Sequence, residues 1–147
     1  MTLIAAVRER IESQVADLAG RVEEVADLAE LVRRGALPQR SPAAFVIPLG
    51  FNALAADAVT GLFRQSLDDV VGVVLVVEAA GDPKAKRAID KVDVLKDAVL
   101  VAMCGWGPAG AIGEFRAQRG RLVSVAAGTV IYQIDFAIQD QLRIATT

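Results

Sequence analysis

Histidine is missing from this chain of 147 residues, and cysteine occurs only once, at Cys104. Because histidine is the commonest general base and metal ligand in proteins, its absence excludes Ser-His-Asp catalysis, Cys-His catalysis and ordinary zinc sites. A single cysteine also excludes a disulfide within the chain. The neighbours Ala102, Met103 and Trp106 predict that Cys104 is a buried apolar residue rather than a nucleophile. The residue types present therefore favour a protein that is not an enzyme.

Strong net charge and long apolar segments are missing as well. The formal net charge is −2 and the isoelectric point is about 5.1, whereas electrostatic binding of nucleic acid needs a basic surface. No apolar run approaches the ~20 residues of a membrane-spanning helix, and the N-terminus lacks the apolar segment of a signal peptide. Hydrophobic residues nevertheless make up 54% of the chain. We expect neither nucleic-acid specificity nor a membrane partner, and we assign the apolar surplus to the core and to contacts with other chains.

The stretch GWGPAG at residues 105–110 has the G-x-G-x-x-G spacing of a dinucleotide-binding loop. That loop follows a strand and opens a helix, whose N-terminus holds the pyrophosphate. Here a predicted helix precedes the glycines and a predicted strand follows them, and Pro108 removes an amide donor. We interpret the stretch as a helix C-terminal turn, in which Gly105 or Gly107 has positive φ and Trp106 packs against the helix end. No cofactor is expected.

Acidic residues provide two weaker hypotheses. Asp68 and Asp69 are adjacent near a predicted turn, as in some cation sites, but the sequence shows no further ligands. Glu114 and Asp135 both fall on predicted strands and would form a glycosidase-type pair only if the fold held them ~5–9 Å apart. We expect neither a metal site nor a catalytic residue.

The N-terminal part predicts two helices. Residues 3–18 carry apolar side chains at spacings of three and four, with Thr2 as the N-cap and Gly20 as the stop. Residues 25–34 predict a second, shorter amphipathic helix.

The middle of the chain predicts strands and one unusual loop. AAFVIPLG, at residues 43–50, predicts a short strand, and Pro48 indicates an edge or a strand end. Residues 50–60 show neither period and predict a loop, although an apolar one that carries Phe51 and Leu54. Because loops usually face water, an apolar loop either folds back on the core or contacts a partner.

Residues 61–82 predict a strand, a turn or bulge near Asp68 and Asp69, and a second strand. The segment VVGVVLVVEA is β-branched and apolar on both faces, as in a central strand that is covered on both sides. We expect the helices of this chain on one side and a neighbouring subunit on the other.

The last part predicts a helix and two strands. The helix has Asp82 as N-cap and Pro83 in its first position, and it ends near Cys104. The strands cover about residues 113–125 and 129–142. From residue 130 onward even positions are apolar and odd positions are polar, with Asp140 as the exception, over more than twice the ~5–6 residues of a typical strand. Such a strand is expected to project beyond its sheet and to need a partner, bulge or curl at its end.

The order of these elements predicts a single α+β domain over residues 1–147. Its sheet is mainly antiparallel, has about five strands and is covered by helices on one face.

Four segments resemble the tail terminator proteins of long-tailed phages, in particular those of prophages and gene-transfer-like particles. The segments are PAAFVIPLG, GLFRQSLDDVVGVVLVVEAAGD, GWGP and GRLVSVAAGTVIYQIDFAIQDQLRI. The resemblance implies a structural protein of the virion tail-neck region, present in the host cytoplasm before assembly. It would form a homo-oligomer, by analogy a hexameric ring, that caps the tail tube protein, ends tube polymerisation and offers a docking surface to the head-tail connector or stopper.

The expected contact residues with the neighbouring subunit or the tube lie in two segments. One is the apolar loop and the other is the polar face of the last strand. They are Phe51, Asn52, Leu54, Asp57, Gln133, Asp135 and Gln139. Three alternatives stay open: another neck or tail-completion protein, a small α+β ligand-binding module, and an enzyme that uses carboxylates.

Overall fold

The computed structural model describes residues 1–25, 41–78, 81, 85–126 and 128–146. These residues form two α-helices, one short 3-10 helix and five strands. In chain order they are α1 (Leu3–Gln14), η1 (Ala16–Leu18), β1 (Val22–Glu24), β2 (Ala43–Val59), β3 (Leu62–Glu78), α3 (Lys86–Met103), β4 (Arg116–Ala126) and β5 (Thr129–Ala145).

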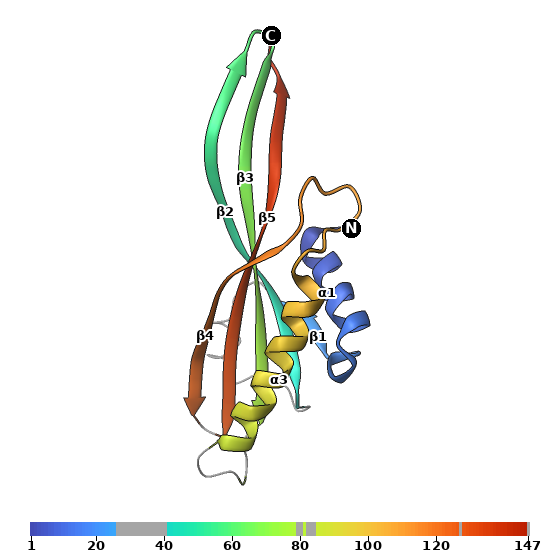
Figure 1. Ribbon diagram of the computed structural model, residues 1–147, viewed down its shortest axis with the longest axis vertical. Coiled ribbons are helices and arrows are strands. Elements are labelled where there is room, and N and C mark those ends of the chain that lie inside the picture. The colour runs from blue at the N-terminus through green and yellow to red at the C-terminus, as the bar shows by residue number, and fades with distance from the viewer. Residues whose placement is uncertain (26–40, 79–80, 82–84, 127, 147) are drawn as a thin grey trace.

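The five strands form one sheet in the order β1-β2-β3-β5-β4. Every pairing is antiparallel except that of β1 with β2. Both α-helices lie on the same side of the sheet (Figure 1). The expected α+β class, with a mainly antiparallel sheet and helices on one face, is therefore confirmed.

The three central strands are much longer than the helices that cover them. β2, β3 and β5 each have 17 residues, which corresponds to roughly 55 Å of extended chain. The longest helix, α3, has 18 residues and spans only about 27 Å. About half the length of these strands therefore projects past the helices (Figure 1). The expectation that the last strand projects beyond its sheet is wrong, because β5 pairs with β3 along its whole length. Instead β2, β3 and β5 project together past the helices.

The core lies where the helices meet the sheet. α1 and α3 contribute one apolar stripe each, and β3 and β5 contribute alternate residues. The most deeply buried members include Val7, Ile11, Leu18, Val73, Leu75, Leu95, Val99, Met103, Ile134 and Phe136. A smaller cluster on the opposite side of the sheet contains Phe45, Ile47, Val74, Val76 and Ile131.

The central position expected for VVGVVLVVEA is confirmed, because β3 lies between β2 and β5. The expectation that a neighbouring subunit covers its second face is wrong. Val74 and Val76, which point to that face, are already buried within the single chain. The apolar surface left for other chains must therefore lie elsewhere.

Residues 50–60 are not the expected loop, because β2 continues to Val59. The pairing of β2 with β3 is shifted between Pro48 and Phe51 and again between Ala53 and Ala56. Each bulge adds one residue to β2 and therefore exchanges the faces of the sheet to which odd-numbered and even-numbered residues point, so the sequence keeps no steady period of two. The two bulges explain why the sequence did not predict this strand.

The expected break at Asp68 and Asp69 is also wrong, because β3 runs through both residues without interruption. Two adjacent aspartates are uncommon within strands and suggested a turn. The turn actually lies at Thr60–Gly61, where Gly61 has a φ of +85° and connects β2 to β3. A short strand β1, which the sequence did not predict, runs parallel to the start of β2.

The helix boundaries differ in part from those expected. Thr2 caps α1 as predicted, since its Oγ1 accepts a hydrogen bond from the amide of Ala5 at 3.1 Å, but α1 ends at Gln14 and a 3-10 turn follows it. α3 begins at Lys86 after Ala85, whose φ is +52°. The predicted caps Asp82 and Pro83, and all of the predicted helix at 25–34 except Val25, lie outside the described residues.

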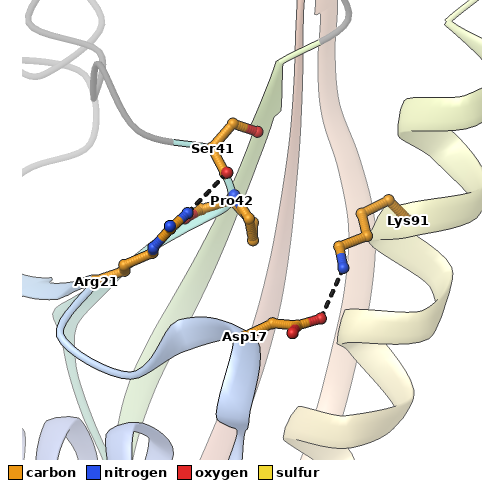
Figure 2. A network of polar contacts seen from close by, with 5 residues as sticks. All are labelled: Asp17, Arg21, Ser41, Pro42 and Lys91. Atoms are coloured by element: carbon orange, nitrogen blue, oxygen red, sulfur yellow. Dashed lines mark hydrogen bonds and ion pairs between the residues drawn. The ribbon is translucent and has the colours of Figure 1, made fainter.

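A small polar network attaches the N-terminal segment to its neighbours (Figure 2). Lys91 on α3 donates to Asp17 at 2.6 Å, and this hydrogen bond, together with the lysine charge, lowers the pKa of Asp17. Arg21 donates to the carbonyl oxygens of Ser41 and Pro42, at 2.7 and 3.4 Å. The segment between α1 and β1 is therefore fixed both to a helix and to the beginning of β2.

The stretch GWGPAG forms the predicted turn at the end of α3. Gly105 has a φ of +81°, and its amide donates to the carbonyl of Phe115 at 2.9 Å. The Trp106 ring stacks on Phe115, with centroids 5.8 Å apart, and Arg10 lies over the same ring at 5.2 Å. Cys104, however, is exposed rather than buried, because it follows the last helical residue and lies outside the apolar stripe.

Close backbone packing in this turn makes Gly107 a sensitive position. A Cβ at residue 107 would overlap the carbonyl oxygen of Gly113, which is backbone and cannot rotate away. We expect Gly107→Ala to lower the free energy of unfolding by roughly 1–3 kcal/mol, as overpacking does elsewhere. The matched control, Ala109→Ser at an exposed position of the same turn, should change it by less than about 0.5 kcal/mol. Urea unfolding followed by circular dichroism measures both, and equal stabilities would contradict the close packing.

Candidate functional site

The projecting half of the sheet forms a three-stranded arm, defined by residues 51–59 of β2, 62–69 of β3 and 139–145 of β5 (Figure 1). The turn at Gly61 lies at its tip, where the amide of Thr146 donates to the carbonyl of Gly61 at 3.0 Å. All of residues 51–59 are exposed. The arm is therefore a surface feature that contributes little to the core of its own chain.

Strand pairing shows which side chains share a face of the arm. β3 and β5 pair without a register shift from Leu62 and Ala145 to Glu78 and Thr129. Residues directly opposite in an antiparallel pair point to the same side, and successive residues alternate. The side that carries Val73 and Ile134, against which the helices pack, can therefore be followed into the arm.

On this helix side the arm is mainly apolar. We call the surface the apolar arm face, and its apolar members are Phe51, Ala53, Ala56, Ala58, Phe63, Leu67, Leu142 and Ile144. Phe51 is 61% exposed, Ile144 is 50% exposed and Leu142 is 38% exposed, because the helices end before they reach the arm. Gln65 lies on the same side, and Leu67 is buried. Exposed apolar side chains gathered on one face of a folded chain are typical of interaction sites.

The other side is the polar arm face. It carries Asn52, Asp57, Arg64, Ser66, Asp68, Gln139, Gln141 and Arg143. Many of its charges and amides are satisfied within the arm: Arg64 pairs with Asp57 at 2.9 Å, and Arg143 donates to Gln141 at 2.7 Å. Arg116, at the start of β4, pairs with Asp68 at 2.6 Å. This face is suited to water, whereas the apolar arm face is not.

Five of the seven predicted contact residues lie in the arm, although not on one face. Phe51 is on the apolar arm face, whereas Asn52, Asp57 and Gln139 are on the polar arm face. Leu54 lies within the second bulge, 45% exposed, and its carbonyl accepts a hydrogen bond from Gln65 at 2.9 Å.

The other two predicted contact residues lie in the body of the sheet. Gln133 is only 3% exposed, and its Nε2 donates to the carboxylate of Asp135 at 2.7 Å. The period of two correctly placed both residues on the side of β5 that faces away from the helices. At this level of the sheet that side is nevertheless largely buried, which the alternation alone does not reveal.

The sequence reasoning missed Phe63, Leu142 and Ile144 as surface residues. Leu142 fitted the apolar stripe of the last strand, which predicted burial, and residues beyond 142 were not assigned to the strand. A usable signal was present, however. The stripe continues for longer than any predicted helix can cover, so its last members had to be exposed or covered by another chain.

Two carboxylates lie at the base of the apolar arm face. Asp69 pairs with Ile138 and Asp140 pairs with Leu67, so both side chains point to the helix side. Burial raises the pKa of Asp69, and the negative charges of Asp140 and Asp68 raise it further. Asp68 itself points to the opposite face, so adjacent Asp68 and Asp69 cannot both bind one cation as the turn hypothesis required.

Among the described residues, no group of three or more Cys, Asp or Glu side chains is arranged to hold a metal ion. None of the helices in the described part of the chain is long and apolar enough to cross a membrane. Glu114 is exposed just before β4, while Asp135 is engaged by Gln133. The features that point to a function are therefore those of the arm surface.

The raised pKa of Asp69 predicts a pH-dependent effect on stability. A folded-state pKa above the ordinary 3.8 means that the folded chain holds the proton more tightly, so stability falls as pH rises from 3.8 through the folded value. We expect Asp69→Asn to raise Tm at pH 7 and to lose this advantage below pH 3.8. Asp68→Asn, which removes the negative charge that pairs with Arg116, should not raise Tm at either pH. Thermal unfolding at pH 7 and pH 3 tests both variants, and an Asp69→Asn gain that is equal at the two pH values would contradict the assignment.

Comparison with known proteins gives one match of fold and one match of family. A chain from the virion of a native gene transfer agent particle has the same fold, with a TM-score of 0.56 over 95% of each chain and 16% sequence identity. No match was found among curated protein sequences. The sequence profile described as phage tail terminator protein matches residues 2–147. The match spans nearly the whole chain, and this protein therefore belongs to the phage tail terminator family of structural tail proteins.

Proposed function

We propose that this protein ends the tail tube of a phage or phage-like particle by closing into a ring on the last ring of tube subunits. One side of the ring binds the tube protein, and the other offers a surface to the head-side connector or stopper and no further tube-binding surface. The observation that carries the proposal is the arm, whose apolar face is left uncovered by its own chain. Membership of the terminator family and the likeness to a virion chain support it.

The arm is suited to contacts between subunits because its own chain leaves Phe51, Leu142 and Ile144 exposed. Burying Phe51, Leu142 and Ile144 against another chain would contribute up to about 1.5–3 kcal/mol for each fully buried side chain. Association of two proteins costs an estimated 4–15 kcal/mol in lost freedom, so one arm contact gives weak binding. Closure of a ring on a tube adds contacts on both flanks and below, and it therefore stabilises the assembly cooperatively.

Electron microscopy and light scattering test this function directly. The purified protein, alone and mixed with growing tubes of its cognate tail tube protein, should give closed rings, by family analogy hexamers, and tubes with one capped end that no longer elongate. Long polymers of this chain would indicate a tube subunit or another tail-completion protein instead. A compact dimer that leaves tubes unaffected and melts later with a small ligand would indicate a binding module.

Substitutions in the arm should separate assembly from folding. The double variant Phe51→Asp, Leu54→Asp places two charges at exposed positions of β2, so the fold should persist while ring formation and tube capping fall at least tenfold. The control Val101→Asp changes a residue of α3 that is 81% exposed and belongs to neither face of the arm. It should assemble like the unmodified protein. If the double variant still forms rings and caps tubes normally, this part of the arm is not an interface.

A further inference from the structure

The apolar arm face continues a surface that helices cover elsewhere in the same chain. In the body of the sheet, α1 and α3 pack on the side that carries Val73 and Ile134. Because β3 and β5 pair without a register shift, this side continues into the arm, past the ends of both helices (Figure 1). An apolar side of a sheet is commonly buried by helices. α1 and α3 cannot bury the arm as well, since their own apolar stripes lie in the core.

The size of the face fits one helix. Three strands and about eight residues of length give it roughly 14 by 26 Å, or about 360 Å². A helix with its side chains is about 10–12 Å wide, and about 17 residues of helix span 26 Å. A stable interface of standard size takes about 800 Å² from each partner, which is more than twice this area. The face is therefore matched to a single segment of a partner rather than to the broad surface of a second domain.

The side chains of the face differ in size from one edge to the other. β2 contributes the small Ala53, Ala56 and Ala58, whereas β3 and β5 contribute the larger Phe63 and Ile144. Facing elements pack closely when large side chains of one lie over small side chains of the other. The face is therefore complementary to a helix whose stripe carries large apolar side chains.

A cavity of about 420 Å³ lies at the base of this face. Its lining includes Leu3 of α1, Ile112 of the segment between α3 and β4, and the carboxylates of Asp69 and Asp140. Asp140 accepts a hydrogen bond from the amide of Gln141 at 2.8 Å. Within the part of the chain that the structure describes, neither carboxylate forms an ion pair. Two negative charges beside apolar side chains are thus left without a cation.

A lysine or an arginine of the partner complements this cavity. Both side chains have an apolar stem, which suits Leu3 and Ile112, and a charged head, which suits Asp69 and Asp140. An opposite charge within about 4–6 Å favours the ionised form of a carboxylate. Towards the tip of the arm, the paired residues on this side carry no charge. The charges at the base therefore also fix which end of the partner segment lies there.

We propose that the apolar arm face binds one amphipathic helix of a partner protein, with its apolar stripe along the arm and a lysine or arginine in the cavity at the base. The inference rests on the proposed function for the use of the arm as a contact surface, and it deepens that function by naming the chemistry of the contact. Its test needs neither a ring nor a tube.

Designed peptides provide the first test. The probe is a fluorescein-labelled helical peptide of about 18 residues, with a leucine stripe and two lysines at one end. The matched peptide has two glutamates in place of the lysines. Fluorescence anisotropy is measured at dilutions where light scattering shows monomeric protein. We expect the lysine peptide to bind about tenfold more tightly than the glutamate peptide, because the cavity is anionic. Equal affinities, or no binding of either peptide, would overturn the proposal.

Variants of the protein locate the binding site. Leu142→Asn, in the middle of the apolar arm face, should weaken the binding of both peptides about tenfold. Asp69→Asn combined with Asp140→Asn should remove the preference for lysine, whereas the control pair Asp57→Asn and Asp68→Asn removes two charges from the polar arm face and should retain it. Circular dichroism checks that each variant is folded. Loss of the preference in the control pair alone would place the peptide on the wrong face.

Rings and tubes separate this inference from the proposed function. If the unmodified protein caps tubes but binds neither peptide, the inference is wrong and the tail function stands. If its rings exclude the lysine peptide, a second copy covers the arm, and the inference is again wrong while the ring stands. Selective binding of the lysine peptide by a protein that ignores tubes would overturn only the tail function.

Discussion

The unbroken pairing of β3 with β5 is the constraint on which the rest of this structure depends. Their 17 paired residues keep one register from the helix-covered body to the tip of the arm. Consequently the same side of the sheet is apolar throughout, whether helices cover it or not. A single shift in this pairing would exchange the two faces and place the polar residues of the arm on the side of the core. The position of every exposed apolar side chain of β5 therefore follows from a register that the core determines.

The irregularities of β2 are consistent with its position beside this rigid pair. β2 is one of the two outer strands of the arm, β5 being the other. β2 has Pro48 and two bulges in its pairing with β3, whereas the pairing of β3 with β5 is continuous. Bulges and proline hinder the addition of a further strand at an edge. The first bulge also places Phe51 on the apolar arm face, and the second places Ala56 there. The edge is thus protected while the face remains available to a partner.

The sequence predicted the fold class, the central strand, the turn after α3 and the long final strand, because each depends on local spacing or residue type. Its errors have a common physical cause. The sequence pattern of β2 is broken by two bulges, Asp68 and Asp69 are unusual within a strand, and Gln133 is buried on a side that appeared solvent-facing. In each case tertiary pairing or coverage decided the outcome, and neither is visible in residue spacing. The sequence therefore predicted only part of the arm as a contact surface. It assigned Phe51 to a loop, and it assigned the contact residues of the last strand to a solvent-facing polar face.

The composition of the apolar arm face limits how strongly one copy can bind another. Between Phe51 and the tip, β2 places only alanines on this face, and the larger side chains come from β3 and β5. Alanine buries little area, so a single contact is weak and an isolated encounter dissociates. Linking several weak contacts in a closed ring raises the effective concentration for each successive one. In the proposed ring, a smaller apolar surface on each subunit would make assembly depend on closure and on the tube beneath it, whereas a larger one would let subunits associate before a tube is present.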